Sequence, residues 1–292
     1  MRYRFLCFPE GKQKAVTLSY DDGVRQDIRF AQTIEKHGMK ATFNINSGFI
    51  PIESGLGRLT AEEIKEFILE KGHEVAVHGD LHCASGVSSS VKIARDVLDC
   101  RLKLENMFSR IIRGMAYPDS GIRNMQNGTD YETVRRILCD LGITYSRTLA
   151  DDNNSFKLPT DWYAWTPTCH HNNPNAIEWA KEFCAIDFSD TAKMYSANRW
   201  PRLFYIWGHT YEFDRNDNWE HIEQLCEILG NREDTWYATN SEIYDYVKAY
   251  ESLIFSADDS IVYNPTVQKI WFEVDGVKYS VNPNETIKID NN

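Results

Sequence analysis

Two pairs of residues in the sequence have the chemistry of metal ligands. Asp21 and Asp22 follow one apolar, strand-like segment, and His78 and His82 follow another. Adjacent carboxylates at the end of a buried strand repel each other, and a bound cation relieves that cost. Two neutral imidazoles four residues apart can converge on one zinc-like ion. Two imidazoles with one carboxylate leave a position open for water, which is typical of a catalytic metal.

Each pair also has a structural interpretation when taken alone. Asp-Asp-Gly at 21–23 is a common turn sequence, and a single His-x-x-x-His is often two unrelated surface residues. The two pairs together, each at a strand end, favour the metal site.

The elements that must position these residues follow a regular alternation. Strands are predicted at 15–20, 41–45, 73–77, 114–117, 143–147, 203–207 and 236–239, and helices at 27–37, 60–71, 88–107, 130–141, 176–184, 219–229 and 241–250. This alternation indicates a parallel β/α architecture. Because polar residues follow several strands, we expect a barrel with its site at the carboxyl ends.

The C-terminal segment has a different pattern. Short alternating strands are predicted after residue 256, and Asp275-Gly276 is a strong hairpin signal. We therefore predict a catalytic barrel at 1–252 and a small antiparallel β appendage at 253–292. The appendage is too short to bury its own core, which favours packing on the barrel over an accessory carbohydrate-binding role.

Composition limits the classes of partner. The 292 residues carry a formal net charge of −11, which argues against nucleic acid as the main partner. No apolar stretch is long enough for a membrane span or a signal peptide. The seven scattered cysteines have no Cys-x-x-Cys spacing. We expect reduced thiols and a cytoplasmic protein, with no membrane partner and no prediction of oligomeric state.

Four stretches resemble, in order, the motifs of the polysaccharide deacetylases, which are the family-four carbohydrate esterases. They are Ser-Tyr-Asp-Asp-Gly at 19–23, His-Gly-Asp-Leu-His at 78–82, Gly-Met-Ala-Tyr-Pro at 114–118 and Ile-Trp-Gly-His at 206–209. The resemblance covers roughly residues 10–250. It implies an α/β fold, a distorted and incomplete (β/α)7-type barrel, in agreement with the alternation above.

The resemblance also implies a role for each matched residue. Asp21 would be the general base, and His209 the general acid that protonates the departing amine. The backbone N–H of Tyr117 would help to hold the oxyanion. The ligands of one divalent metal would be Asp22, His78 and His82. We expect zinc, with cobalt, nickel and iron as alternatives.

The third and fourth motifs depart from the family pattern. The usual Arg-x-Pro-Tyr reads Gly-Met-Ala-Tyr at 114–117, and Arg113 lies one position early, facing the other side of a strand. The arginine beside the base is therefore expected to be Arg147, or Arg113 after a bulge. The fourth motif of the family, which comes before Ile-Trp-Gly-His in the chain, is matched only loosely, at 161–171. Its substrate-binding candidates, with Arg147, are Asp161, Trp165 and His170, although Trp165 can equally be a core residue.

These observations predict a metal-dependent hydrolase that removes acetyl groups, most simply N-acetyl groups, from a sugar or polysaccharide. One alternative is an imide or ureide hydrolase of the allantoinase type, in the same superfamily. Another is a carbohydrate-binding protein without catalysis, which the complete first two motifs and His209 disfavour.

Overall fold

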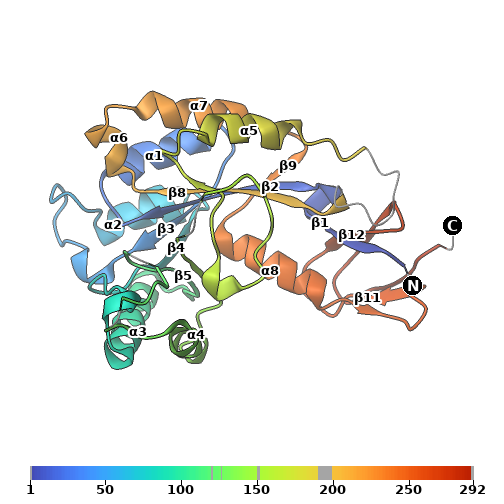
Figure 1. Cartoon of the computed structure of the whole chain (residues 1–292), viewed down its shortest axis with the longest axis horizontal. Helices are drawn as coiled ribbons and strands as arrows, with labels where there is room; N and C mark the ends of the chain where they lie inside the picture. Colours follow the sequence, from blue (N-terminus) through green and yellow to red (C-terminus); the bar gives the residue numbers. More distant parts are fainter. Residues whose placement is uncertain (1, 120, 126, 150–151, 190–198, 291–292) are drawn as a thin grey trace.

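The centre of the molecule is a curled sheet of parallel strands wrapped by helices (Figure 1). The computed structural model describes residues 2–119, 121–125, 127–149, 152–189 and 199–290. The strand order is β6-β5-β4-β3-β2-β8-β7, and β9 pairs with the start of β2. The strands are β2 (Lys14–Asp21), β3 (Ala41–Ile45), β4 (Glu74–Val77), β5 (Gly114–Ala116), β6 (Tyr145–Arg147), β7 (Cys169–His170), β8 (Arg202–Gly208) and β9 (Thr235–Tyr237).

One irregular segment brings the two edges of this sheet together. The Trp165 N–H donates to the Ser146 carbonyl at 3.0 Å, beside β6. A few residues later, the Thr168 N–H donates to the Tyr205 carbonyl of β8 at 2.8 Å. The sheet therefore curls into a distorted, incomplete barrel, and the predicted fold class is confirmed.

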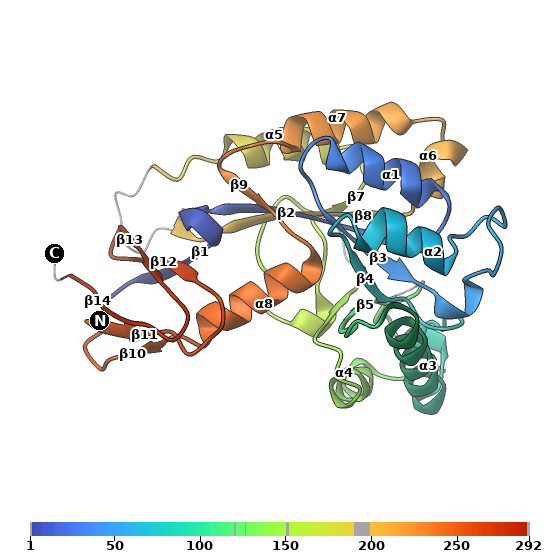
Figure 2. The same ribbon diagram turned by 180° about the vertical axis from the view of Figure 1, so that it is seen from behind.

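The helices form groups around the barrel (Figures 1 and 2). On one side α1, α5 and α7 lie together, and on another α3 packs against α4. The helices are α1 (Gln26–Glu35), α2 (Ala61–Ile64), α3 (Ser90–Phe108), α4 (Tyr131–Asp140), α5 (Ala176–Ala185), α6 (Tyr211–Arg215), α7 (Trp219–Leu229) and α8 (Asn240–Glu251).

The predicted helix at 60–71 begins as expected but changes its winding. Thr60 and Glu63 form a capping box, in which each side chain binds the other residue's backbone N–H. From Lys65 to Leu69 the helix widens to π geometry. This winding brings both Ile68 and Leu69 to the core.

The C-terminal strands form two small antiparallel sheets, as predicted. Their orders are β1-β12-β13 and β10-β11-β14. The strands are β1 (Arg4–Cys7), β10 (Ile254–Phe255), β11 (Ile261–Tyr263), β12 (Ile270–Val274), β13 (Val277–Val281) and β14 (Thr286–Lys288). The hairpin at Asp275-Gly276 is present, and both turn residues have positive φ. The boundary at residue 252 stays a prediction, although β1 pairs with β12 in the C-terminal sheet.

The appendage packs on the barrel through α8. Tyr246 of α8 donates its hydroxyl hydrogen to the Cys7 carbonyl at 3.0 Å and accepts the Trp271 N–H at 2.9 Å. Phe272 is fully buried in the same apolar cluster as Leu203 of β8. The barrel and the appendage therefore share one core at this junction.

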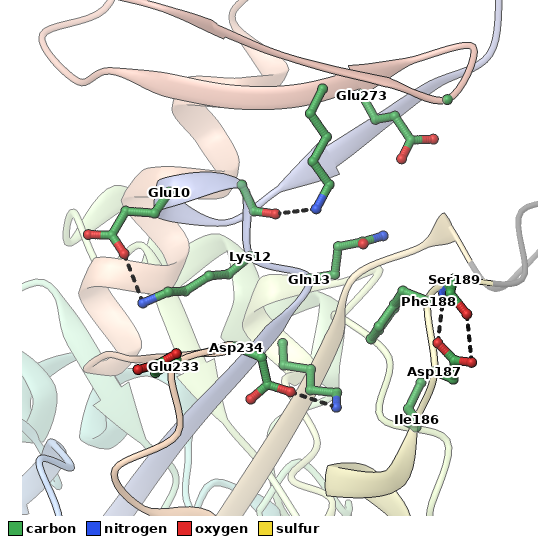
Figure 3. A pocket seen from close by; sticks show the side chains of 14 residues that line it. Glu10, Lys12, Gln13, Ile186, Asp187, Phe188, Ser189, Glu233, Asp234 and Glu273 are labelled. Atoms are coloured by element: carbon green, nitrogen blue, oxygen red, sulfur yellow. Dashed lines mark hydrogen bonds and ion pairs between the residues drawn. The ribbon is translucent and has the colours of Figure 1, made fainter.

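A cavity of about 660 Å³ lies between the appendage and the amino end of the barrel (Figure 3). Its lysines are already paired, since Lys12 binds Glu10, Lys14 binds Asp234 and Lys278 donates to the Gly11 carbonyl. The contact between Lys278 and Gly11 joins the appendage to the end of the barrel opposite the carboxyl ends of the strands.

Each of the seven cysteines has a free thiol. Among the described residues, none of the helices combines the length and the apolar character that a bilayer span requires.

Removal of residues 251–292 is expected to destabilise the barrel. The truncation leaves β1 without a partner and exposes the surface that Phe272 and Val274 cover. Each buried side chain of this kind contributes about 1.5–3 kcal/mol, so the free energy of unfolding should fall by several kcal/mol. Urea denaturation of both chains measures it. A truncated chain of unchanged stability that had lost only polysaccharide binding would contradict the packing role.

Candidate active site

Four strands of the barrel deliver polar side chains to the same edge. Asp21 ends β2, Arg147 ends β6, and His78 and His209 directly follow β4 and β8. Tyr20 is in register with Gly208, which sets Asp21 level with His209. Because all these strands are parallel, their carboxyl ends meet at one mouth of the barrel.

Asp21 is the buried centre of this group, with only 2% of its surface exposed. One carboxylate oxygen accepts a hydrogen bond from Asn44 Nδ2 at 2.8 Å, and the other binds the Arg147 guanidinium. His78 Nε2 and His209 Nε2 lie 3.8 and 3.9 Å from that second oxygen.

The surroundings of Asp21 keep it ionised. Burial alone would raise the pKa of this carboxyl, but the nearby positive charge, above all Arg147, outweighs burial and lowers the pKa. A carboxylate with this environment can accept a proton from water at neutral pH.

Asp22 points to a different set of partners. One ligand atom from each of Asp22, His78 and His82 lies within 4.8 Å of the others. His82 Nε2 is 4.0 Å from Asp22 Oδ1, and the two imidazole rings are 4.8 Å apart. The two neighbouring aspartates therefore have separate environments. Asp21 is buried against Arg147, whereas Asp22 lies in a candidate ligand triad, with Arg58 Nη1 3.6 Å from its Oδ1.

The tautomer of His78 suits a metal ligand. Its Nδ1 lies 2.9 Å from the Ala116 carbonyl, which can only accept a hydrogen bond. The proton of the neutral ring is thus on Nδ1, and the Nε2 lone pair faces the triad. Burial lowers the pKa of His78, which keeps the ring neutral.

Two tight turns aim the triad inward. Asp22 and His82 both have positive φ, at 85° and 57°, a strained conformation that is common at functional sites. Gly79 also has positive φ, and a Cβ there would lie 2.2 Å from a carboxylate oxygen of Asp96. Asp96 of α3 accepts hydrogen bonds from the backbone N–H groups of Leu81 and Cys83, which folds the turn back toward β4.

His209 is held between two carboxylates. Its Nε2 faces Asp21, and its Nδ1 lies 3.6 Å from Oε1 of Glu212. Glu212 belongs to α6, which begins two residues after His209. Burial alone would lower the pKa of His209, but Glu212 and Asp21 outweigh burial and raise it. Protonated His209 is therefore favoured, as a general acid requires.

Glu212 also contacts two other imidazoles. His170 Nε2 and His171 Nε2 lie 3.0 and 3.1 Å from Glu212 Oε2. His170, His209 and Glu212 are close enough to bind an ion, but His170 Nδ1 accepts the Asn172 N–H at 3.1 Å. The proton of neutral His170 is then on Nε2, directed at Glu212, which suits a hydrogen bond and opposes metal ligation.

Comparison with known proteins finds a family to which part of this chain is similar. The family model for polysaccharide deacetylase matches residues 9–145, just under half of the chain and the part that carries Asp21, Asp22, His78 and His82. Residues 9–145 are therefore similar to the polysaccharide deacetylase family. This match agrees with the predicted class of enzyme, a hydrolase that deacetylates carbohydrates. A search among curated proteins gave no match.

Solved structures share the deacetylase fold over most of the chain. A Mycobacterium smegmatis protein provisionally assigned as a polysaccharide deacetylase is 16% identical, with a TM-score of 0.54, and the match covers 84% of this chain and 94% of that one. The Xyl-CE4 domain of a multidomain xylanase from the hindgut metagenome of Trinervitermes trinervoides is 14% identical, with a TM-score of 0.51 and coverage of 81% and 92%. The match to the Streptococcus pyogenes deacetylase PplD is 19% identical, with a TM-score of 0.41, and spans 51% of this chain and 61% of that one.

The structure decides between the two arginines proposed for the deacetylase site. Arg147 binds Asp21 and is 1% exposed, and its guanidinium carbon lies 4.4 Å from the centre of the Trp207 ring. Arg113 instead binds Asp245 of α8 at 2.8 Å. Arg147 is therefore the arginine beside Asp21.

The role expected of the Tyr117 N–H needs correction. This N–H donates to the Arg147 carbonyl at 3.0 Å, extending the pairing of β5 with β6. The Tyr117 hydroxyl donates to the Tyr163 carbonyl at 2.9 Å. Because the N–H and the hydroxyl of Tyr117 both donate to other carbonyls, neither is free to hold an oxyanion.

The loosely matched fourth motif lies mainly outside the site. Trp165 is only 1% exposed and packs edge-on against Tyr145 and Tyr205, so its expected role as a wall of a sugar site is corrected to a core role. Asp161 accepts the Tyr163 N–H and caps a short turn, and its role in substrate binding stays a prediction. His170 does lie beside the site, through Glu212.

Several residues of the site were not predicted. Glu212 is the most important, and its only sequence signal is its position three residues after His209. Asn44 and Asp96 lie on the strand and helix between the recognised motifs, and their roles depend on tertiary contacts. Trp207 is part of the Ile-Trp-Gly-His stretch, but its place beside His170, with the two rings 4.7 Å apart, was not predicted.

Proposed function

We propose that this protein is a metal-dependent deacetylase that hydrolyses N-acetyl groups of a sugar polymer. The observation that carries the proposal is that the side chains of Asp21 and Asp22 have different surroundings. Asp21 is buried against Arg147, whereas Asp22 turns toward His82. Asp21 would therefore act as the proton acceptor and Asp22 as a metal ligand.

The proposed metal site would use Asp22, His78 and His82, with one divalent ion, zinc in the first instance. Two neutral imidazoles and a carboxylate are suitable zinc ligands, and the Nδ1–H of His78 is already fixed by the Ala116 carbonyl. A metal bound there would polarise the acetyl carbonyl and lower the pKa of water.

The residues of the chain would perform the two proton transfers. Asp21 accepts a proton from the attacking water, and Arg147 and Asn44 fix its orientation. His209 delivers a proton from Nε2 to the departing nitrogen, while Glu212 beside Nδ1 favours the charged ring. The breakdown of the tetrahedral intermediate then releases acetate and a free amine.

Acetate release with and without metal tests the proposal. The metal-stripped chain should release no acetate from N-acetylated oligosaccharides, and added zinc should restore the reaction. Hydrolysis of an imide or ureide without acetate release would favour the allantoinase-type alternative. Sugar binding that needs no metal and gives no acetate would indicate a protein without catalysis.

A further inference from the structure

We propose that a second carbohydrate-binding site lies at the junction of α8, β9 and β12, away from the catalytic residues. A cavity of about 350 Å³ opens there. Binding pockets for small molecules typically combine apolar and aromatic walls with a few polar groups. The residues that line this cavity are Pro9, Trp236, Glu242, Asp245, Tyr246, Gln268, Lys269 and Trp271.

Two tryptophans give the cavity rigid aromatic walls. Trp236 and Trp271 are half-buried, so that each keeps part of its ring accessible. The Trp236 ring lies 5.4 Å from that of Tyr246, and the Trp271 backbone N–H is fixed by the Tyr246 hydroxyl. Indole faces suit the C–H surface of a sugar ring, because they add contact area with little loss of side-chain entropy.

The polar groups of the cavity are close to electrical balance. Glu242 binds Lys40 at 2.5 Å, and Asp245 binds Arg113 at 2.8 Å. Lys269 lies with its ammonium 4.9 Å from the centre of the Trp271 ring. Paired carboxylates keep lone pairs that can accept hydrogen bonds from hydroxyl groups. This combination favours a neutral, polyhydroxylated ligand over a phosphate or another strong anion.

The cavity is remote from the proposed catalytic centre. Trp236 is in register with Ala15 at the start of β2, and Asp21 is six residues further along the same strand. At about 3.3 Å per residue the two places are about 20 Å apart along the strand. A polymer held at the cavity would have a raised effective concentration at the catalytic centre, whereas a short substrate would gain nothing. In this respect the inference rests on the proposed function, since it assumes a polymeric substrate.

Titration calorimetry with a trimer of N-acetylglucosamine tests the site directly. The trimer is too short to reach both places, and an Asp21→Asn background prevents its hydrolysis. We expect two bound trimers per chain, and only one after Trp271→Ala. Gln268→Ala/Lys269→Ala, which removes polar groups and leaves the Trp236–Tyr246 contact in place, should weaken the same binding event. In the chain with Asp21 intact, Trp271→Ala should raise KM for polymer and leave kcat/KM for the trimer unchanged.

Trp200→Ala is the matched control, because Trp200 is 61% exposed, contacts Phe5 and does not line the cavity. The inference is overturned if neither cavity variant changes trimer binding, or if Trp200→Ala changes it equally. Active protein with unaltered trimer binding in the variants would refute this site alone. If the cavity variants bind one trimer fewer, but the protein with Asp21 intact never releases acetate, the proposed catalysis alone is refuted.

Discussion

Replacement of Asp21 by asparagine is expected to lower kcat for acetate release by about 10²–10⁴-fold, the usual cost of losing a general base. Asparagine keeps the size of the side chain and can still accept a hydrogen bond from Arg147. It cannot take a proton from water. Steady-state kinetics on an N-acetylated oligosaccharide, with elemental analysis of the same samples, measures both effects. Metal content should stay near that of the wild type.

His209→Ala provides the matched comparison for this variant. It should also lower kcat without loss of metal, because Nε2 faces Asp21 outside the ligand triad. Its effect should be smallest on an activated aryl acetate, whose leaving group needs no proton. Full activity of Asp21→Asn, or loss of metal from His209→Ala, would show that the two roles are assigned wrongly.

Joint replacement of Asp22 and His78 by alanine is expected to abolish both metal binding and activity on every substrate. The two changes remove two of three ligands, so the remaining His82 is a single imidazole. Dialysis against zinc followed by elemental analysis should give about one metal per wild-type chain and none for the variant. Circular dichroism checks folding, since His78 is buried.

Glu212→Gln is a useful control for the metal assay, because Glu212 contacts imidazoles that are not in the proposed triad. It should bind as much metal as the wild type. Equal metal content in the wild type and in the Asp22→Ala/His78→Ala variant would place the metal elsewhere.

The proposed ligands could be predicted because their positions depend on topology alone. Once strands alternate with helices, parallel pairing brings the ends of β2 and β4 to one edge, and Asp22 and His78 follow from that. Strand positions also limited the arginine beside Asp21 to two candidates, Arg113 and Arg147. The hydrogen bond between Arg147 and Asp21 in the structure identifies Arg147.

The remainder depends on contacts that no local pattern encodes. Trp165 is in a polar stretch of sequence, yet it packs against the rings of Tyr145 and Tyr205 from two distant strands. The N–H of Tyr117 is used because β6 happens to lie beside it. Glu212 belongs to a five-residue helix, too short to have a readable periodicity.

The pairing of β1 with β12 has a consequence for how the protein forms during synthesis. Arg4 is in register with Val274, so the two strands are separated by nearly the whole chain. The barrel strands from β2 to β9 can pair with one another as they leave the ribosome, because domains fold progressively from the N-terminus. Strand β1 must instead wait for a strand that is synthesised after the whole barrel. Until β12 arrives, β1 is an unpaired edge with Phe5 and Leu6 exposed, so this part of the nascent chain needs chaperone protection while the barrel forms.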